Sequence, residues 1–329
     1  MTGAGGRRSV GAMARLGRPV CLSLTVLLFG PAVGSAVAQQ PACGQVVTHD
    51  VRLAQDLRCP DSDGLVVGAH GITIDLNGHA IQQGIGSRGG GVAVDNDGGY
   101  DGVTVKNGTL GADGNGVRLI GASGNRLVDL SAAGGVEAVS IEGGSANRIV
   151  RGSFNGFAGI RVRDSDSVRI TDASVRSTPS NGISLTGSWG VIARNTVPAR
   201  IDVAGNGNRV SDNVVVGALD AAIAIVSGSG NAVVRNWAVD TEPVIANEDS
   251  TGDGIHVGAF TAGTVVRENI AVRNGDDGID LESSSARVVR NLANDNADLG
   301  IDARPGTSAA GNLARGNGNP AQCAGISCG

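Results

Sequence analysis

The sequence has a single lysine, Lys106, a single tyrosine, Tyr100, and only 2% aromatic residues in 329. Acidic side chains outnumber basic ones, 31 against 26, which argues against a protein that neutralises nucleic-acid phosphates with a basic surface. After residue 38 no apolar run approaches the roughly 18 residues that a membrane-spanning helix needs, so stable membrane insertion is not expected. The scarcity of aromatic rings also leaves few platforms on which sugars could stack.

The N-terminus has the pattern of a cleaved signal peptide over residues 1–38. Four arginines precede the apolar run VCLSLTVLLFG, and an Ala-x-Ala site ends at Ala38. Arg7 and Arg8 raise the alternative of a twin-arginine export signal, although they lie far from the apolar run. The segment holds four of the 26 basic residues and no acidic ones, so 22 basic and 31 acidic residues remain, a formal charge of −9. We expect a mature chain that is secreted, periplasmic or at the cell surface.

Glycine accounts for 54 residues, and short β-branched runs alternate with Gly, Asn, Asp and Ser, which is typical of strands and tight turns. A Gly-Ile/Val-x-Val/Leu segment recurs, as in GVRL at 116, GIRV at 159, GIHV at 254 and GIDL at 278. Most of its steps are 21 to 24 residues. That period is typical of stacked supersecondary units.

A second column of residues confirms the same register. NWAV at 236, NIAV at 269, NLAN at 291 and NLAR at 312 each begin with Asn, and in the last three coils another Asn follows five residues later. Each repeat has room for two or three short strands and none for a crossover helix, so one coil per repeat is expected, with strands about 4.8 Å apart. We expect the stacked Asn side chains to point inward and hydrogen-bond along the stack.

These repeats resemble the right-handed parallel β-helix proteins of the pectin lyase-like superfamily. The resemblance covers nearly all of residues 43–328, with ITIDLNGHAI at 72–81 similar to an opening coil and the closing GNLARGNGNPAQCAGISC similar to a terminal coil. It implies an all-β, single-stranded parallel β-helix of about 12 coils. The domain would span residues 39–329, with capping coils at 43–81 and 304–329. Because this fold hosts both enzymes and non-enzymatic proteins, it does not fix a function.

Four cysteines follow the signal segment: Cys43, Cys59, Cys323 and Cys328. An even number in an exported protein indicates two disulfides. About 12 coils would separate the ends by roughly 55 Å, whereas the Cα atoms of a disulfide lie within about 7 Å. We therefore expect Cys43 to pair with Cys59 and Cys323 with Cys328, each closing one end of the stack.

The stretch NGDDGIDL at 274–281 concentrates acidic residues near the end of the repeats. If Ile279 and Leu281 point inward, strand alternation places Asp280 outward. The same position holds His256 one coil earlier and Asp302 one coil later, so these three side chains should form a row with a spacing of about 4.8 Å. The step from Asn236 to Asn269 is 33 residues, whereas the neighbouring steps are 22 or 23, so about 11 residues are inserted before Asp253. Such loops often flank a binding face.

Three interpretations of this acidic cluster remain open. The acids are turn caps and solvated side chains; or Asp277, Asp280 and Asp302 bind a cation, most plausibly Ca²⁺, which prefers oxygen ligands; or the cluster is catalytic, with an Asp as general acid or base. The catalytic candidates are Asp253, His256, Asp276, Asp277 and Asp280.

The sequence therefore favours a monomeric, secreted β-helix that engages an extracellular polysaccharide, as a lyase, epimerase or hydrolase if it is catalytic. The Gly-His-Gly and Arg-x-Lys signatures of polygalacturonases are absent, as is the Asp-Pro-His-Asp signature of alginate C5 epimerases. The alternative is a non-catalytic periplasmic or surface scaffold.

Overall fold

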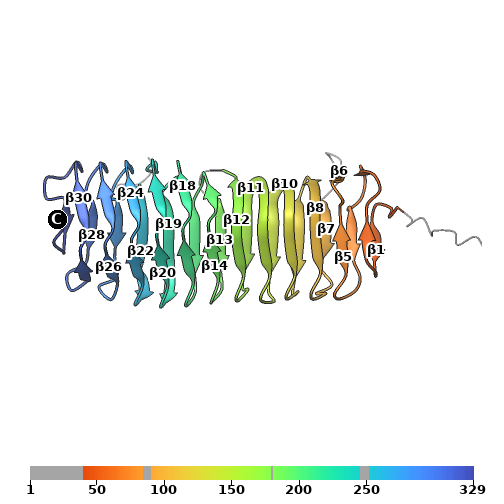
Figure 1. Cartoon of the computed structure of the whole chain (residues 1–329), viewed down its shortest axis with the longest axis horizontal. Coiled ribbons are helices and arrows are strands. Elements are labelled where there is room, and N and C mark those ends of the chain that lie inside the picture. The colour runs from red at the N-terminus through yellow and green to blue at the C-terminus, as the bar shows by residue number, and fades with distance from the viewer. Residues whose placement is uncertain (1–39, 84–89, 179–180, 245–251) are drawn as a thin grey trace, which may run out of the picture. The chain divides into compact units, whose positions relative to one another are not determined.

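The structure is a computed structural model that describes residues 40–83, 90–178, 181–244 and 252–329. The expected signal peptide lies outside these residues. Among them the regular elements are 31 strands, all paired in parallel and stacked coil upon coil (Figure 1). No helix of the described residues combines the length and apolar character that crossing a bilayer requires. The expected all-β parallel β-helix of about 12 coils is confirmed.

Each coil runs through three faces, which we call face 1, face 2 and face 3. Face 1 comprises β1 (Gln45–Val47), β4 (Leu65–Val67), β7 (Val92–Asn96), β9 (Asn115–Ile120), the ends of β10 (Arg126–Glu142) and β11 (Arg148–Arg163), β13 (Ile183–Thr186), β16 (Ile201–Ala204), β19 (Ala221–Ser229), β22 (Asp253–Ala262), β25 (Ile279–Leu281), β28 (Ile301–Ala303) and β31 (Cys323–Ala324).

Face 2 comprises β2 (Val51–Arg52), β5 (Thr73–Asp75), the starts of β8 (Thr104–Ala112), β10, β11 and β12 (Arg169–Arg176), then β14 (Val191–Ala193), β17 (Arg209–Ser211), β20 (Ala232–Val234), β23 (Val265–Arg267), β26 (Arg287–Val289) and β29 (Ser308–Ala310). Face 3 comprises β3 (Leu57–Cys59), β6 (Ala80–Gln83), later parts of β8, β10, β11 and β12, then β15 (Thr196–Val197), β18 (Val214–Val216), β21 (Trp237–Val239), β24 (Ile270–Val272), β27 (Leu292–Asn294) and β30 (Leu313–Arg315).

The core is a continuous column of small aliphatic side chains. Alternation sends every second residue inward: in β25, Ile279 and Leu281 are buried while Asp280 between them is not. Phe154 is the largest fully buried side chain. Stacking short strands in register buries these residues without any helix, because each coil covers the apolar edge of the next.

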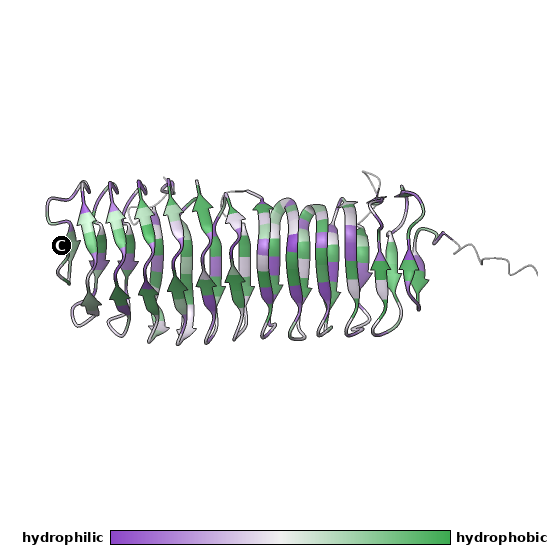
Figure 2. Cartoon of the chain, viewed as in Figure 1, coloured by the Kyte–Doolittle hydropathy of each residue, from purple (hydrophilic) through white to green (hydrophobic). Residues whose placement is uncertain are grey.

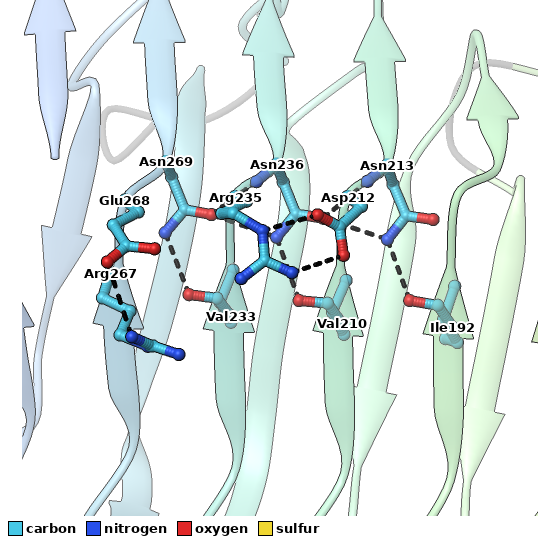
Figure 3. Close-up of polar contacts among 10 residues, drawn as sticks. All are labelled: Ile192, Val210, Asp212, Asn213, Val233, Arg235, Asn236, Arg267, Glu268 and Asn269. Carbon is cyan, nitrogen blue, oxygen red and sulfur yellow. Dashed lines mark hydrogen bonds and ion pairs between the residues drawn. The ribbon is translucent and has the colours of Figure 1, made fainter.

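Buried asparagines hold the corner between faces 2 and 3. The Asn236 Nδ2 donates to Val210 O and to Asn269 Oδ1, both at 3.0 Å, and Asn213 repeats the pattern one coil earlier (Figure 3). A second ladder at the corner between faces 3 and 1 contains Asn274 and Asn296. The inward Asn columns expected from the sequence are confirmed, and they satisfy backbone carbonyls that the turns would otherwise leave unpaired.

Both expected disulfides are present. Cys43 pairs with Cys59 across 16 residues, and Cys323 pairs with Cys328 across five. Each ties together neighbouring segments at one end of the stack, where an exposed strand edge has no further coil to cover it. Disulfides are typical of proteins outside the reducing cytoplasm.

Candidate functional site

Face 1 carries the row expected from the sequence. His256 in β22 is in register with Asp280 in β25, and Asp280 is in register with Asp302 in β28. The flanking residues Ile279 and Leu281 belong to the core, so the alternation is confirmed. The structure brings all five candidate catalytic residues and Asp302 to one end of this face, over three successive coils.

The same row continues towards the N-terminus through Ala224, Asp202, Ser184, Arg161, Ser140 and Arg118. Its basic end is internally neutralised, because Arg118 pairs with Asp95 and Arg161 with Glu137. Ala224 occupies the outward position next to His256 and is completely buried. The acidic end of the row is therefore its least compensated part.

His256 lies among three carboxylates. Its Nδ1 is 2.9 Å from Asp280 Oδ2 and 3.4 Å from Asp253 Oδ2, and its Nε2 is 4.0 Å from Glu282 Oε2. The two Nδ1 contacts are close enough for ion pairs, although neither has the alignment of a hydrogen bond. The imidazole side chain is only 20% exposed, so its charge is shielded from bulk water.

Asp253 and Asp277 each use one oxygen for a backbone contact. Asp253, the first residue of β22, accepts the Asp277 N–H through Oδ1 at 3.2 Å, and Asp277 accepts the Leu299 N–H through Oδ1 at 2.8 Å. These bonds join consecutive coils, as the turn-cap interpretation requires. Asp253 Oδ2 is nevertheless buried without a hydrogen bond, so capping accounts for only part of this residue's environment.

Burial dominates the protonation of the cluster. It raises the pKa of Asp277 to about 8, and the neighbouring carboxylates add to the effect. It also raises the pKa of Asp253 to about 6, although His256 opposes the shift. For His256, burial lowers the pKa, but Asp253 and Asp280 outweigh it and raise the value to about 10. At neutral pH the imidazole is therefore a cation and Asp277 is mostly protonated.

A cavity of about 510 Å³ opens onto these groups. It is lined by Asp253, Asp276, Asp277, Asp280, Leu281, Glu282, Asp302, Ala303, Arg304, Pro305, Ala324 and Gly325. Burial followed by repulsion from other carboxylates raises the pKa of Asp276 and of Asp302. The cavity is consequently a place where negative charge is costly and where a cation or a proton is favoured.

The three residues expected to bind a cation are suitably placed. Oxygens of Asp277, Asp280 and Asp302 lie within 4.8 Å of one another, which matches two ligands on one Ca²⁺ with bonds of about 2.3–2.6 Å. Two further groups have the same spacing: Asp253 with His256 and Asp280, and Asp276 with Asp277 and Asp298. The donor set therefore fits an oxygen-preferring divalent cation.

An exposed aromatic side chain lies beside the site and shortly after the insertion in the sequence. Phe260 is 85% exposed near the end of β22, and the Ala259 N–H donates to Glu282 Oε2 at 3.0 Å. The path from Ile255 to Val265 is longer than in neighbouring coils, and this extra length projects the Phe260 ring from the fold. The position of Phe260 shortly after the insertion is the sequence signal that places it near the site, whereas its exposure follows from the irregular coil length.

The insertion before Asp253 is described only in part. Among its acidic residues, Glu242 is paired with Leu219 in an isolated bridge, whereas Glu248 and Asp249 lie outside the described residues. The sequence also gave no reason to select Arg304, Pro305 or Gly325. They reach the cavity because the last coils close its C-terminal end.

Comparison with known proteins agrees with this architecture. The family described as "Right handed beta helix region" matches residues 90–238. An alginate lyase from Paenibacillus sp. str. FPU-7 superimposes with a TM-score of 0.50 and 12% identity, covering 82% of this chain and 97% of that one. This chain is a right-handed parallel β-helix. The acidic cavity of this β-helix lies beyond the residues that the family matches.

Other structures show weaker likeness. The catalytic domain of a GH87 alpha-1,3-glucanase has a TM-score of 0.44 and 14% identity, covering 86% of this β-helix and 61% of that chain. The Streptococcus pneumoniae surface protein and adhesin PfbA has a TM-score of 0.40 and 10% identity, covering 80% and 89%. No curated protein sequence matches significantly.

Proposed function

We propose that the protein engages an extracellular polysaccharide along face 1 and hydrolyses it at the acidic cavity. The observation that carries this proposal is the convergence of Asp253, Asp277, Asp280 and Asp302 on one cavity of about 510 Å³, with His256 in contact with Asp253 and Asp280. A glycosidic bond is cleaved by one carboxylic acid that donates a proton and one carboxylate that acts as nucleophile or base. The cavity offers both forms side by side.

Asp277 is suited to be the proton donor. Its pKa of about 8 keeps it protonated at neutral pH, and the Leu299 N–H fixes the orientation of its carboxyl group. Asp280 is the proposed nucleophile or base, and its Oδ2 lies 2.9 Å from Nδ1 of the His256 cation. Because Asp277, Asp280 and Asp302 have oxygens within 4.8 Å of one another, the spacing is nearer to that of retaining than of inverting hydrolases.

The charge on His256 argues against a lyase or epimerase that uses this imidazole as its base. A general base must be unprotonated at the working pH, and the His256 pKa of about 10 keeps it protonated. In the proposed site His256 instead positions Asp280 and balances the charge of Asp253.

A cation-binding, non-catalytic scaffold is the second candidate function, and the donor set of Asp277, Asp280 and Asp302 favours it. Bound Ca²⁺ would neutralise these carboxylates and could ligate an acidic sugar. Asp277 would then be ionised, so proton donation by Asp277 and cation binding exclude one another. The effect of added Ca²⁺ therefore distinguishes the two proposals.

The test is turnover of a glycan panel that includes alginate and α-1,3-glucan, assayed in EDTA and in Ca²⁺. Hydrolysis produces reducing ends without unsaturated uronates, whereas a lyase produces ultraviolet-absorbing unsaturated ends. We expect hydrolysis in EDTA that Asp277→Asn and Asp280→Asn abolish, whereas the exposed control Asp129→Asn keeps it. Binding without turnover, together with a Ca²⁺-dependent rise in Tm, would support the scaffold instead.

A further inference from the structure

A line of outward side chains on face 3 changes its chemistry half-way along the stack. In register, coil after coil, it reads Thr109, Ser131, Ser153, Ser174 and Thr196, and then Val214, Trp237, Ile270, Leu292 and Leu313. A parallel line beside the apolar half reads Val216, Val239 and Val272 and then turns polar at Asn294 and Arg315. The first five coils have an ordinary solvated face, whereas the last five carry one continuous apolar line, which is two residues wide over three coils.

This apolar face is open to solvent. Trp237 is 53% exposed and Val214 and Val216 are each 38% exposed, while their neighbours on the face are half-buried. In Figure 2 the β18 strand is green, whereas the β10 and β11 strands mix purple and green. Contiguous exposed apolar surface on a protein usually marks an interaction site, and its confinement to one half of the line excludes a general property of the fold.

Charged residues border the apolar face on both edges. On three successive coils, the residue in the left-handed conformation at the corner between faces 2 and 3 is Arg235, Glu268 and Arg290. Figure 3 shows the first two. The corresponding residues at the corner between faces 3 and 1 are Asp240, Arg273 and Asp295.

Every one of these coils therefore has opposite charges on its two edges. Arg290 and Asp295 share one coil, both are exposed, and neither takes part in an ion pair among the described residues. They are the charges with most capacity for a new partner.

We propose that two copies of this chain pack through the apolar half of face 3, with the two-fold axis parallel to the axis of the stack. Such an axis keeps the order of the coils and reverses the strands, so each edge meets the other edge of the partner on the same coil. Arg235 then lies opposite Asp240, Glu268 opposite Arg273, and Arg290 opposite Asp295. All three pairs have opposite charge, and a two-fold interface forms each pair twice. Only the Arg290–Asp295 pair joins residues without an ion pair of their own among the described residues, because Arg235 already pairs with Asp212, Glu268 with Arg267 and Arg273 with Asp240.

The other face-to-face arrangement is electrostatically unfavourable. A two-fold axis along the strands reverses the coil order and brings each edge against itself. Centred on Ile270, it places Arg235 opposite Arg290, Arg273 opposite Arg273, and Asp240 opposite Asp295, all with like charges. The charges therefore select one orientation.

The size of the face sets the strength of the association. Five coils at about 4.8 Å give a length of about 24 Å, and the short strands give a width of roughly 10–15 Å. That is roughly 240–360 Å² per partner, less than half of the ~800 Å² of a standard stable interface, so the dimer should be weak and transient. Face 1 remains free, so the association does not depend on the proposed hydrolysis. The proposed dimer differs from the monomer expected from the sequence.

The test is sedimentation velocity of the mature protein over a concentration series at low salt. We expect wild type to dimerise, and Arg290→Asp or Asp295→Arg to raise the Kd by about tenfold, because each substitution occurs twice and creates repulsion. The double variant Arg290→Asp/Asp295→Arg restores the pairs with reversed sign and should return the Kd to the wild-type value. Trp237→Ser should abolish dimerisation.

Arg151→Asp is the matched control, because it changes the same kind of left-handed corner position beside the polar half of the line; it should dimerise like wild type. An unchanged Tm shows that each variant folds. Correct folding is expected because Asp and Arg both already occupy left-handed corner positions elsewhere, as in Asp240 and Arg273. A wild type that stays monomeric at the highest concentration overturns the proposal. A double variant whose Kd does not return to the wild-type value also overturns the proposal, since the apolar face would then serve a partner other than a second copy.

Discussion

The substitution Asp277→Asn tests how much an ionised carboxylate in the acidic cavity lowers the stability of the fold, because it prevents ionisation and leaves the packing nearly unchanged. Asn has nearly the shape of a protonated Asp and can still accept the Leu299 N–H that Asp277 accepts at 2.8 Å. It cannot ionise. The substitution therefore keeps the side chain at position 277 uncharged at every pH, which is the state that the folded protein prefers at neutral pH.

The sign of the effect follows from the raised pKa. Folding shifts the pKa of Asp277 from an ordinary 3.8 to about 8, so between these values the folded state holds a proton that the unfolded state has released. Where the native state binds more protons, the free energy of unfolding falls as pH rises. Wild type should thus lose stability between about pH 4 and pH 8 relative to Asp277→Asn.

The size of the effect is bounded by the shift. A tenfold change in proton affinity corresponds to 1.36 kcal/mol, so the full change is worth at most ~5 to 6 kcal/mol. Asp277 is 8% exposed at the wall of an open cavity, where water reduces the cost of ionisation. We expect Asp277→Asn to be more stable than wild type by about 2–3 kcal/mol at pH 8 and to approach it near pH 4.

The measurement is chemical denaturation of both proteins from pH 4 to pH 8 in EDTA, since a bound cation would stabilise ionised Asp277 and cancel the difference. Asp129→Asn provides the control: Asp129 is exposed and its pKa is lowered by Arg151, so this substitution gives no stabilisation that grows with pH. A difference for Asp277→Asn that is flat with pH, or that shrinks as pH rises, would refute the reasoning.

Other parts of the fold give further predictions. Asn236→Ala should lower the free energy of unfolding by about 4 kcal/mol in urea, because it leaves ladder partners on both neighbouring coils unpaired; the exposed ion-pair substitution Asp212→Ala should cost less than ~1 kcal/mol. Loss of the Cys43–Cys59 disulfide should cost about 3 kcal/mol and loss of Cys323–Cys328 about 2 kcal/mol, since the first closes the longer loop; equal Tm changes on the two single-pair Cys→Ser replacements would contradict this.

Register was predictable because a strand has a side-chain period of two and a coil has a nearly constant length. Once Ile255 and Ile279 are assigned to the core, His256 and Asp280 must point outward and stand one coil apart, and the structure pairs them. The disulfides follow from the same geometry, because only cysteines at the same end of the stack can meet.

The burial of individual side chains and the irregular lengths of some coils were not predictable in the same way. The sequence assigns Asp253, Asp276 and Asp277 alike to turns, yet Asp253 is 2% exposed and Asp276 is only half-buried. Asp253 begins β22, which is paired with β19 and β25, whereas Asp276 lies in the turn before β25. This difference in burial affects how strongly each carboxyl group holds a proton. Phe260 is exposed because its coil is longer than its neighbours, which a repeating pattern cannot reveal.

The outward residues on the three faces can be substituted independently of one another, because the buried asparagine ladders hold the coils in register whatever side chains lie outside them. Asn236 and Asn269 keep their 3.0 Å contact although 33 residues separate them, so the insertion between them leaves the corner intact. On the same coils, face 1 concentrates His256 and Asp280 while face 3 exposes Trp237 and Ile270. Substitution of an outward residue on one face should therefore change binding there without altering the register of the others, as expected for a fold in which each coil contacts only its neighbours.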